Sequence, residues 1–407
     1  FTAVPDGVAA GQYAIINGEQ YPIVATTATT VTLEYSALLA DPTGTPVVQF
    51  ALWRFAGKYR GLSSYSRASR RTYIDPLTGQ VTGAPAGFPA FERMADGGIG
   101  ILLEGSSTNY LLDSQNFAAA NWGKQGCTVA AATGVIGPDG STNCYTITDD
   151  VTNGYHRIYQ TVASIPAGSQ TAYAIVKAGT MTQCSVMMRN PTDGQVALAY
   201  FDLTNGTITS VISGSAKIVP LANGWYWCEV YGTGTAASNV YIGIASAGTT
   251  FYTGAGTGTV HIWHAQGEPM PFGTSVIPTT TTTVTRAADD LYFTGTGNIT
   301  DKFTIIADVE FEPGQTAEPR VFGTRNGTSY IRTFTSNWNV KTTGANSLNF
   351  YHPSTIYDGQ THRLAFVFDN AQRYGAIWEN GILRVQNTAL VDNVSLANLT
   401  SLGVGSY

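Results

Sequence analysis

The stretch Asn223-Gly224-Trp225-Tyr226-Trp227-Cys228-Glu229-Val230-Tyr231 decides the fold, because a turn dipeptide leads straight into a run of aromatic and apolar residues. Asn-Gly is typical of a tight turn, and aromatic residues favour the pleated surface of a strand. Two more runs of this kind follow at residues 240–244 and 260–266, separated by Gly, Ser and Thr. Short strands separated by turn residues predict an antiparallel β-sandwich.

The same pattern extends over residues 111–278, which we expect to form one sandwich domain. Turn dipeptides such as Asp193-Gly194 and Asn205-Gly206 separate the runs, and helical periodicity is almost absent. The further strands that we predict upstream of the opening stretch lie at residues 144–148, 156–162, 170–177, 183–188, 196–203 and 207–212.

Two segments precede this domain. Residues 1–57 predict a small N-terminal β attachment domain, with a hairpin turn at Asn17-Gly18. Residues 58–110 alternate Gly, Pro and Ser with short apolar pieces and predict an irregular connector. We expect the N-terminal domain to dock the chain to a larger particle or to sister chains.

A Thr-rich linker at residues 279–290 leads to a second β-sandwich at residues 291–407. The alternation of Phe303, Ile305, Ala307, Val309 and Phe311 predicts a strand with these five side chains turned inward. Asn-Gly at residues 380–381 predicts a second hairpin. The fold class is therefore all-β and multi-domain: a small N-terminal β unit followed by two antiparallel sandwiches of jelly-roll type.

Composition excludes several classes of function. Only 12% of the residues are charged and the net charge is −6, so the chain lacks the positive surface that nucleic-acid binding needs. No apolar run reaches the ~20 residues of a membrane helix. The four cysteines show no Cys-x-x-Cys spacing and the five histidines no metal-ligand spacing, so we expect buried thiols, no metal and no cofactor.

Two charged groups could carry chemistry. Asp308, Glu310 and Glu312 share one strand face, as the paired carboxylates of glycosidases do, but a solvated outer face is the favoured interpretation and we expect no enzyme. A basic group could bind an acidic glycan or phosphate, although a solvated or intersubunit face is favoured. This group comprises Arg60, Arg67, Arg70 and Arg71.

Aromatic side chains are the best candidates for binding. Sugar rings present apolar C–H faces, so a glycan site needs flat exposed aromatics beside polar donors and acceptors. Core packing remains the alternative for each of them. The candidate glycan-binding residues are Trp225, Trp227, Trp263, Trp338, Tyr351, Tyr357 and Trp378.

The order of several motifs carries a resemblance. Arg67-Ala68-Ser69-Arg70-Arg71, Leu102-Leu103-Glu104-Gly105, the Gly-Trp-Tyr strand, Ile262-Trp263-His264-Ala265-Gln266 and Thr285-Arg286-Ala287-Ala288-Asp289 follow one another along the chain. Together, over residues 60–290, they resemble the carbohydrate-binding-module-like sandwich of phage and prophage virion proteins. Residues 291–407 resemble a laminin-G-like or concanavalin-like jelly roll, which usually has more strands and implies a chain that continues beyond Tyr407.

The resemblance implies a bacteriophage virion protein of the tail-fibre, baseplate or receptor-binding type that presents glycan-binding sandwiches for host adhesion. The expected partners are other virion proteins, sister chains in a homo-oligomer such as a trimer, and a host surface glycan, without nucleic acid or membrane insertion. The expected location is the virion, after synthesis in the host cytoplasm. The alternatives are a purely structural decoration or spacer protein and a polysaccharide-degrading tailspike.

Overall fold

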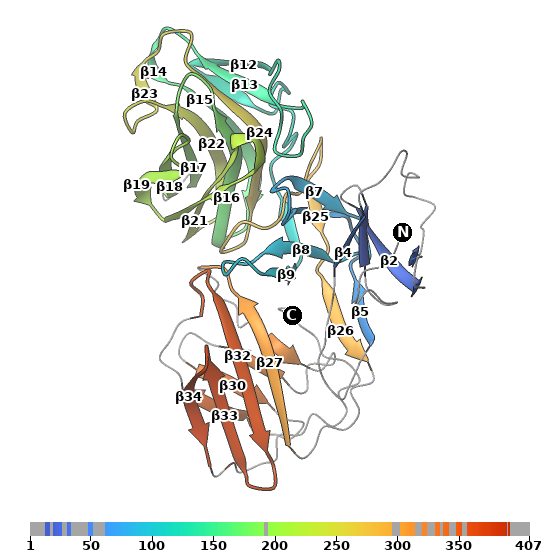
Figure 1. Ribbon diagram of the computed structural model, residues 1–407. Coiled ribbons are helices and arrows are strands. Elements are labelled where there is room, and N and C mark those ends of the chain that lie inside the picture. Colours follow the sequence, from blue (N-terminus) through green and yellow to red (C-terminus); the bar gives the residue numbers. More distant parts are fainter. Residues whose placement is uncertain are drawn as a thin grey trace.

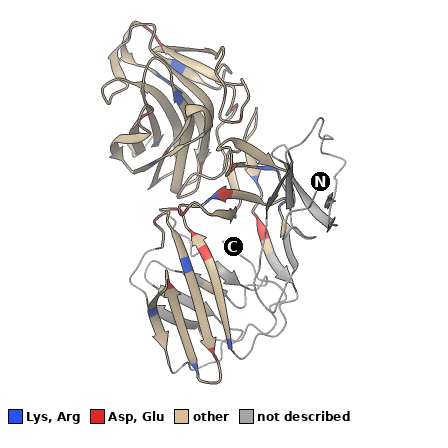
Figure 2. Cartoon of the chain, viewed as in Figure 1, with Lys and Arg blue, Asp and Glu red and all other residues tan. Residues whose placement is uncertain are grey.

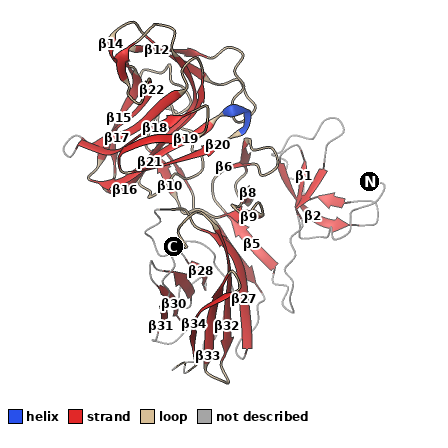
Figure 3. Ribbon diagram, turned by 60° about the vertical axis from the view of Figure 1, so that its left-hand side comes forward, coloured by secondary structure: helices blue, strands red, loops and turns tan. Residues whose placement is uncertain are grey.

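The computed structural model of the chain is built almost entirely from antiparallel β-strands (Figures 1 and 3). A single short 3-10 turn, Ala222–Gly224, interrupts them within the described residues. The predicted all-β class is therefore confirmed. The residues that the structure describes are 13–16, 19–26, 31–33, 48–51, 62–190, 194–294, 302–313, 320–323, 330–333, 337–341, 347–351, 356–388 and 390.

The N-terminal unit is a four-stranded antiparallel sheet in the order β3-β2-β1-β4. Its central strand β1 pairs with β2 on one side and with β4 on the other. The Asn17-Gly18 turn predicted between the first two strands lies outside the described residues. The strands are β1 (Tyr13–Ile16), β2 (Glu19–Thr26), β3 (Val31–Leu33) and β4 (Val48–Ala51).

The middle sandwich consists of two six-stranded sheets, here called sheet A and sheet B. All the strands that the sequence predicts in this domain are present. Sheet A has the order β11 (Gly123–Gln125), β15 (Arg157–Ile165), β22 (Ala237–Ala245), β17 (Gln183–Asn190), β18 (Gly194–Asp202) and β19 (Thr207–Ser213). Sheet B has the order β12 (Cys127–Ala131), β13 (Tyr145–Asp149), β24 (Thr259–Glu268), β16 (Gly168–Ala178), β21 (Tyr226–Gly234) and β20 (Ser215–Pro220).

The main hydrophobic core lies between these two sheets and takes alternate residues from each strand. Cys228 and Val230 of β21 face Cys184 and Val186 of β17 across it, and all four are fully buried. The two thiols approach to 4.0 Å and remain free. Period-two burial of this kind leaves the other residues of every strand on the outer face of its sheet.

The connector is more regular than the sequence predicts, because its strands pair with segments that follow the sandwich. Strand β10 pairs with β25 and strand β5 with β26, so the chain enters and leaves the sandwich side by side (Figure 1). Two hairpins, β6–β7 and β8–β9, complete this unit. Its strands are β5 (Leu62–Ser66), β6 (Arg71–Ile74), β7 (Val81–Ala84), β8 (Ala90–Arg93), β9 (Ile99–Leu102), β10 (Ser107–Asn109), β25 (Val284–Arg286) and β26 (Asp290–Thr294).

The third unit contains two four-stranded sheets, in the orders β27-β32-β33-β34 and β28-β29-β30-β31. The five residues predicted to face inward along β27 all pack against the core of this unit, which confirms the alternation. Positive φ angles of 52° at Asn380 and 79° at Gly381 give the predicted hairpin turn. The strands are β27 (Lys302–Glu310), β28 (Arg320–Gly323), β29 (Tyr330–Thr333), β30 (Asn337–Lys341), β31 (Ser347–Tyr351), β32 (Thr361–Asp369), β33 (Tyr374–Glu379) and β34 (Ile382–Asn387).

Charged side chains are sparse on the middle sandwich, whose ribbon is almost wholly tan in Figure 2. Polar contacts nevertheless join the units: Glu310 of β27 accepts a hydrogen bond from the Ala95 amide, and Lys217 of β20 pairs with Glu312. Over the described part of the chain, the structure contains no helix of the length and apolar character that crossing a membrane requires.

Candidate functional site

The outer face of sheet B is covered by other parts of the chain. Trp227 of β21 and Trp263 of β24 lie on this face, where Val81 of the connector joins their cluster. Val276 of the exit segment, residues 269–289 after β24, belongs to the same cluster. Trp225 joins the same cluster from the turn before β21. The prediction that these three tryptophans form a sugar platform is therefore wrong, because all three are buried.

Hydrogen bonds confirm that the covered tryptophans serve packing. The Trp225 indole N–H donates to the Ile136 carbonyl, and the Trp227 indole N–H donates to the buried Glu229 carboxyl. The Trp227 ring also stacks on Tyr173 with 3.9 Å between ring centroids. Burial with a satisfied indole N–H is how tryptophan stabilises a core.

The remaining predicted aromatics belong to the third unit. Tyr357 is half-buried and meets Phe311 edge to face, with 5.7 Å between centroids. Trp378 of β33 is 36% exposed and keeps a ring surface open to solvent. Trp338 and Tyr351 lie on β30 and β31, and their side chains fall outside the described residues.

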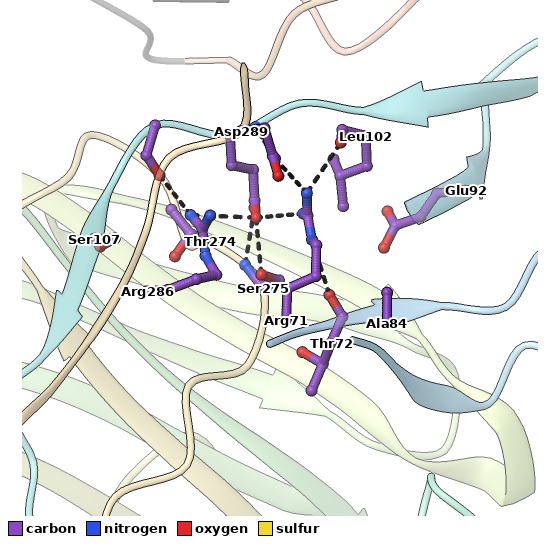
Figure 4. Close-up of polar contacts among 12 residues, drawn as sticks. Arg71, Thr72, Ala84, Glu92, Leu102, Ser107, Thr274, Ser275, Arg286 and Asp289 are labelled. Carbon is purple, nitrogen blue, oxygen red and sulfur yellow. Dashed lines mark hydrogen bonds and ion pairs between the residues drawn. The ribbon is translucent and has the colours of Figure 1, made fainter. Parts of the chain in front are cut away.

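A buried charge network holds the cover on sheet B. Arg71 forms an ion pair with Asp289 (Figure 4) and another with Glu104. Arg67 also pairs with Asp289. Arg286 contributes a further pair to Glu104 at 3.3 Å. The predicted solvated or intersubunit face is therefore wrong for Arg67 and Arg71, whose side chains are buried against these carboxylates. Arg70 is exposed, and Arg60 lies outside the described residues.

The electrostatics of Glu104 show why this network is stable. Burial alone would raise the pKa of Glu104, but Arg71, Arg286 and two hydrogen bonds from Ser275 outweigh burial and hold the pKa below its usual value. Desolvated charges are tolerated only when they are paired and hydrogen-bonded in this way. The network joins the connector to the exit segment across more than 180 positions of sequence.

The outer face of sheet A is formed by a different set of residues. Its apolar cluster, Met187, Leu198, Tyr200 and Ala245 with Tyr241 beside them, comes entirely from the sheet's own strands. Tyr159 of β15 and Tyr241 of β22 are directly opposite partners, with 5.5 Å between ring centroids. Both tyrosines are partly exposed, so this face presents aromatic surface that sheet B hides.

An arginine lies among the aromatic rings of sheet A. The Arg157 guanidinium carbon lies 4.1 Å from the Tyr155 ring centroid and 4.3 Å from that of Tyr241. Its Nε donates to the Gln125 side chain at 2.9 Å. Stacking between two rings fixes the guanidinium plane and leaves its outer edge available as a donor. We call Tyr155, Arg157, Tyr159 and Tyr241 the Tyr/Arg cluster.

The edge of sheet A is fixed beneath this cluster by His156, which is fully buried. The two ring nitrogens of His156 lie 2.5 Å from the Gly126 carbonyl and 3.0 Å from the Tyr252 carbonyl. A side chain at Gly126 would meet the Tyr155 carbonyl at 2.3 Å, and its φ of +59° also requires glycine. These contacts hold Tyr155 and Arg157, the two neighbours of His156, in place.

The acidic triplet of β27 takes part in structural contacts. Asp308 receives two hydrogen bonds from Arg363, at 2.7 and 2.8 Å, and these hold the pKa of Asp308 below its usual value. Glu310 and Glu312 make the contacts to Ala95 and Lys217 described above. Within the described residues, no three His, Cys, Asp or Glu side chains are grouped closely enough to hold a metal ion.

The Tyr/Arg cluster is not among the predicted site residues. Tyr155, Arg157 and Tyr159 stand at alternate positions of the sequence, the spacing of one strand face. In the structure Arg157 and Tyr159 share β15, and Tyr155 ends the preceding strand β14 (Asn153–Tyr155), which pairs with β23 (Phe251–Thr253). Tyr241 between Val240 and Ile242 follows the same rule on the paired strand. Tryptophan was given more weight than tyrosine, and the sequence does not show which sheet face the connector covers.

Comparisons with known proteins give little guidance. No protein-family model matches the chain, and no curated protein matches it. Among solved structures, domains LG4–5 of the mouse laminin α1 chain align with 12% identity over 69% of this chain and 86% of that one, with a TM-score of 0.22. The functional proposal below depends on the residues of the chain itself.

Proposed function

We propose that the chain is a non-enzymatic adhesion protein whose middle sandwich binds saccharides on the outer face of sheet A. The observation that carries the proposal is the Tyr/Arg cluster, in which Tyr155 and Tyr241 enclose Arg157 and the rings of Tyr159 and Tyr241 remain partly exposed. Aromatic rings pack against the C–H faces of sugars, and guanidinium and amide groups bind their oxygens.

Polar side chains beside the cluster suit this role. Gln125 lies next to Arg157, and Thr161 donates to Asn239 at 2.8 Å on the row beyond Tyr159. Hydroxyl and amide groups at the rim of an aromatic surface supply the directional contacts that distinguish one sugar from another. Sites of this open kind bind weakly one at a time and become effective when many copies act together.

We further propose that these copies belong to a bacteriophage particle, as a tail-fibre, baseplate or receptor-binding component in a homo-oligomer. The support is the motif order of the sequence. Five charged residues of those motifs belong to the buried network: Arg67, Arg71, Glu104, Arg286 and Asp289. A shared structural role for the motif residues is a reason to expect the same kind of module here.

A glycan array probed with the full chain tests the binding role. We expect a defined set of host-surface glycans to bind, and Tyr159→Ala to lose that binding while Trp378→Ala, in the third unit, retains it. Absence of binding to any glycan would favour the structural spacer instead. Antibody labelling of purified particles tests the virion role, which fails if the label stays with the host-cell fraction.

A further inference from the structure

The positive charge of Arg157 indicates which chemical class of ligand the Tyr/Arg cluster binds. Arg157 of β15 and Arg189 of β17 both belong to the outer face of sheet A, on strands that β22 separates. Among the described residues, the Arg157 guanidinium has Gln125 as its hydrogen-bond acceptor and forms no ion pair. Within the described residues Arg157 therefore has no carboxylate partner, although the chain has a net charge of −6.

Asp202, an acidic side chain of the same sheet, is held by contacts within its own turn. Asp202 lies at the end of β18, where its Oδ1 accepts the amides of Thr204 and Asn205 and its Oδ2 accepts the Asn205 side chain. That carboxylate therefore closes its own turn. Burial lowers the pKa of Arg157, and Arg189 lowers it further, yet a guanidinium stays protonated at neutral pH.

Side chains on the outer face of sheet A form rows that run across the strands, and these rows place the arginines relative to the aromatic rings. Tyr159, Tyr241, Met187 and Leu198 are successive cross-strand partners and form an apolar row across the sheet. Arg157 belongs to the row on one side and Arg189 to the row on the other, each about 7 Å away along the strands. Met187 and Leu198 are buried, whereas Tyr159 and Tyr241 are partly exposed, so a sugar ring lying on the two tyrosines would carry its substituents toward Arg157.

We propose that the Tyr/Arg cluster binds an anionic saccharide, with sugar rings on Tyr159 and Tyr241 and a carboxylate or sulfate group on the outer edge of Arg157. This inference rests on the proposed function and narrows it. The planar guanidinium pairs with both oxygens of a carboxylate at once, which a neutral hydroxyl does not offer.

Titration of the full chain with matched ligands tests the inference. The panel contains oligosaccharides of alginate, hyaluronate and polygalacturonate, each beside its carboxyl-reduced form, then dextran sulfate beside dextran, and polyglutamate as an anion without sugar rings. At least one acidic saccharide is expected to bind about tenfold or more tightly than its neutral form. The carboxylated and sulfated arms show which anion is preferred.

Variants complete the test. Arg157→Gln should reduce the ratio of the two affinities, acidic form over neutral form, from about tenfold to about one. Arg363→Gln makes the same charge change on an exposed arginine of the third unit and should leave the preference intact. Thermal unfolding of each variant establishes that it is folded.

The outcomes separate this inference from the function on which it rests. Equal binding of acidic and neutral saccharides overturns the inference but leaves the glycan-binding function in place. Polyglutamate binding as tightly as the acidic saccharides overturns the inference and indicates a general anion site instead of a glycan site. Failure of every saccharide to bind overturns both. Retention of the acidic preference by Arg157→Gln also overturns the inference.

Discussion

Arg71 and Asp289 lie 218 positions apart in the sequence and form a buried ion pair. Arg71 precedes the middle sandwich and Asp289 follows it. Their contact joins the connector to the exit segment, and together these two segments cover the outer face of sheet B, which carries the tryptophans. The same closure leaves sheet A with the exposed aromatic face. The assignment of the two faces therefore depends on a contact between distant parts of the chain.

Asp289→Asn tests the energetic weight of that contact. The substitution keeps the shape of the side chain and leaves Arg67 and Arg71 without their shared counter-charge, so we expect the free energy of unfolding to fall by about 3–5 kcal/mol. Urea unfolding measures the change. Asp308→Asn, which removes one partner of an exposed pair with Arg363, is the control and should have a much smaller effect. Similar midpoints for the two variants would show that the network contributes little.

Truncation of a covered tryptophan should damage stability. Trp227→Ala removes the ring that stacks on Tyr173 and opens a cavity under the connector, at an expected cost of about 3–5 kcal/mol. Differential scanning calorimetry measures the loss. A melting temperature equal to that of the wild type would mean that Trp227 is not part of a packed core.

Stability should decrease as the pH rises through the range of the buried carboxyls. Burial raises the pKa of Glu229 from 4.5 to about 7. The folded state therefore holds a proton that the unfolded state has already released, and stability is greatest below pH 4.5 for this group and falls until pH 7. The slope is at most about 1.4 kcal/mol per pH unit for one carboxyl.

Glu229→Gln provides the comparison for that pH dependence. Urea unfolding between pH 5 and pH 8 should show a shallower decline for the variant than for the wild type. Burial also raises the pKa of Glu92 to about 7. Because Glu92 is present in both proteins, the free energy of unfolding should still fall somewhat with pH in the variant as well as in the wild type. Parallel curves for the two proteins would rule out Glu229 as a source of the effect.

The cysteines should react slowly in the native protein. Burial raises the pKa of Cys127 and of Cys144 to about 11, so few thiolates exist at pH 8. Labelling with a thiol reagent before and after unfolding measures the difference, and four thiols should appear only in denaturant. Rapid labelling of all four in the native state would contradict this burial.

Local sequence predicted the strands well because alternation and turn residues act over short distances. Strands β11, β12 and β20 of the middle sandwich were not predicted. Lys217 and Pro220 interrupt the apolar pattern of β20, and β11 and β12 have only three and five residues. The candidate site was predicted poorly for a different reason. The spacing of Trp225 and Trp227 shows that they share a strand face, but whether that face is covered depends on Val81 and Val276, which lie far away in sequence.

The most direct test of the account compares one residue from each sheet face in the same binding experiment. Isothermal titration with the glycan that binds most tightly should give an affinity at least about tenfold weaker for Tyr241→Ala and an unchanged affinity for Trp263→Phe. Loss of affinity in Trp263→Phe together with unchanged affinity in Tyr241→Ala would contradict the assignment of sheet A as the binding face.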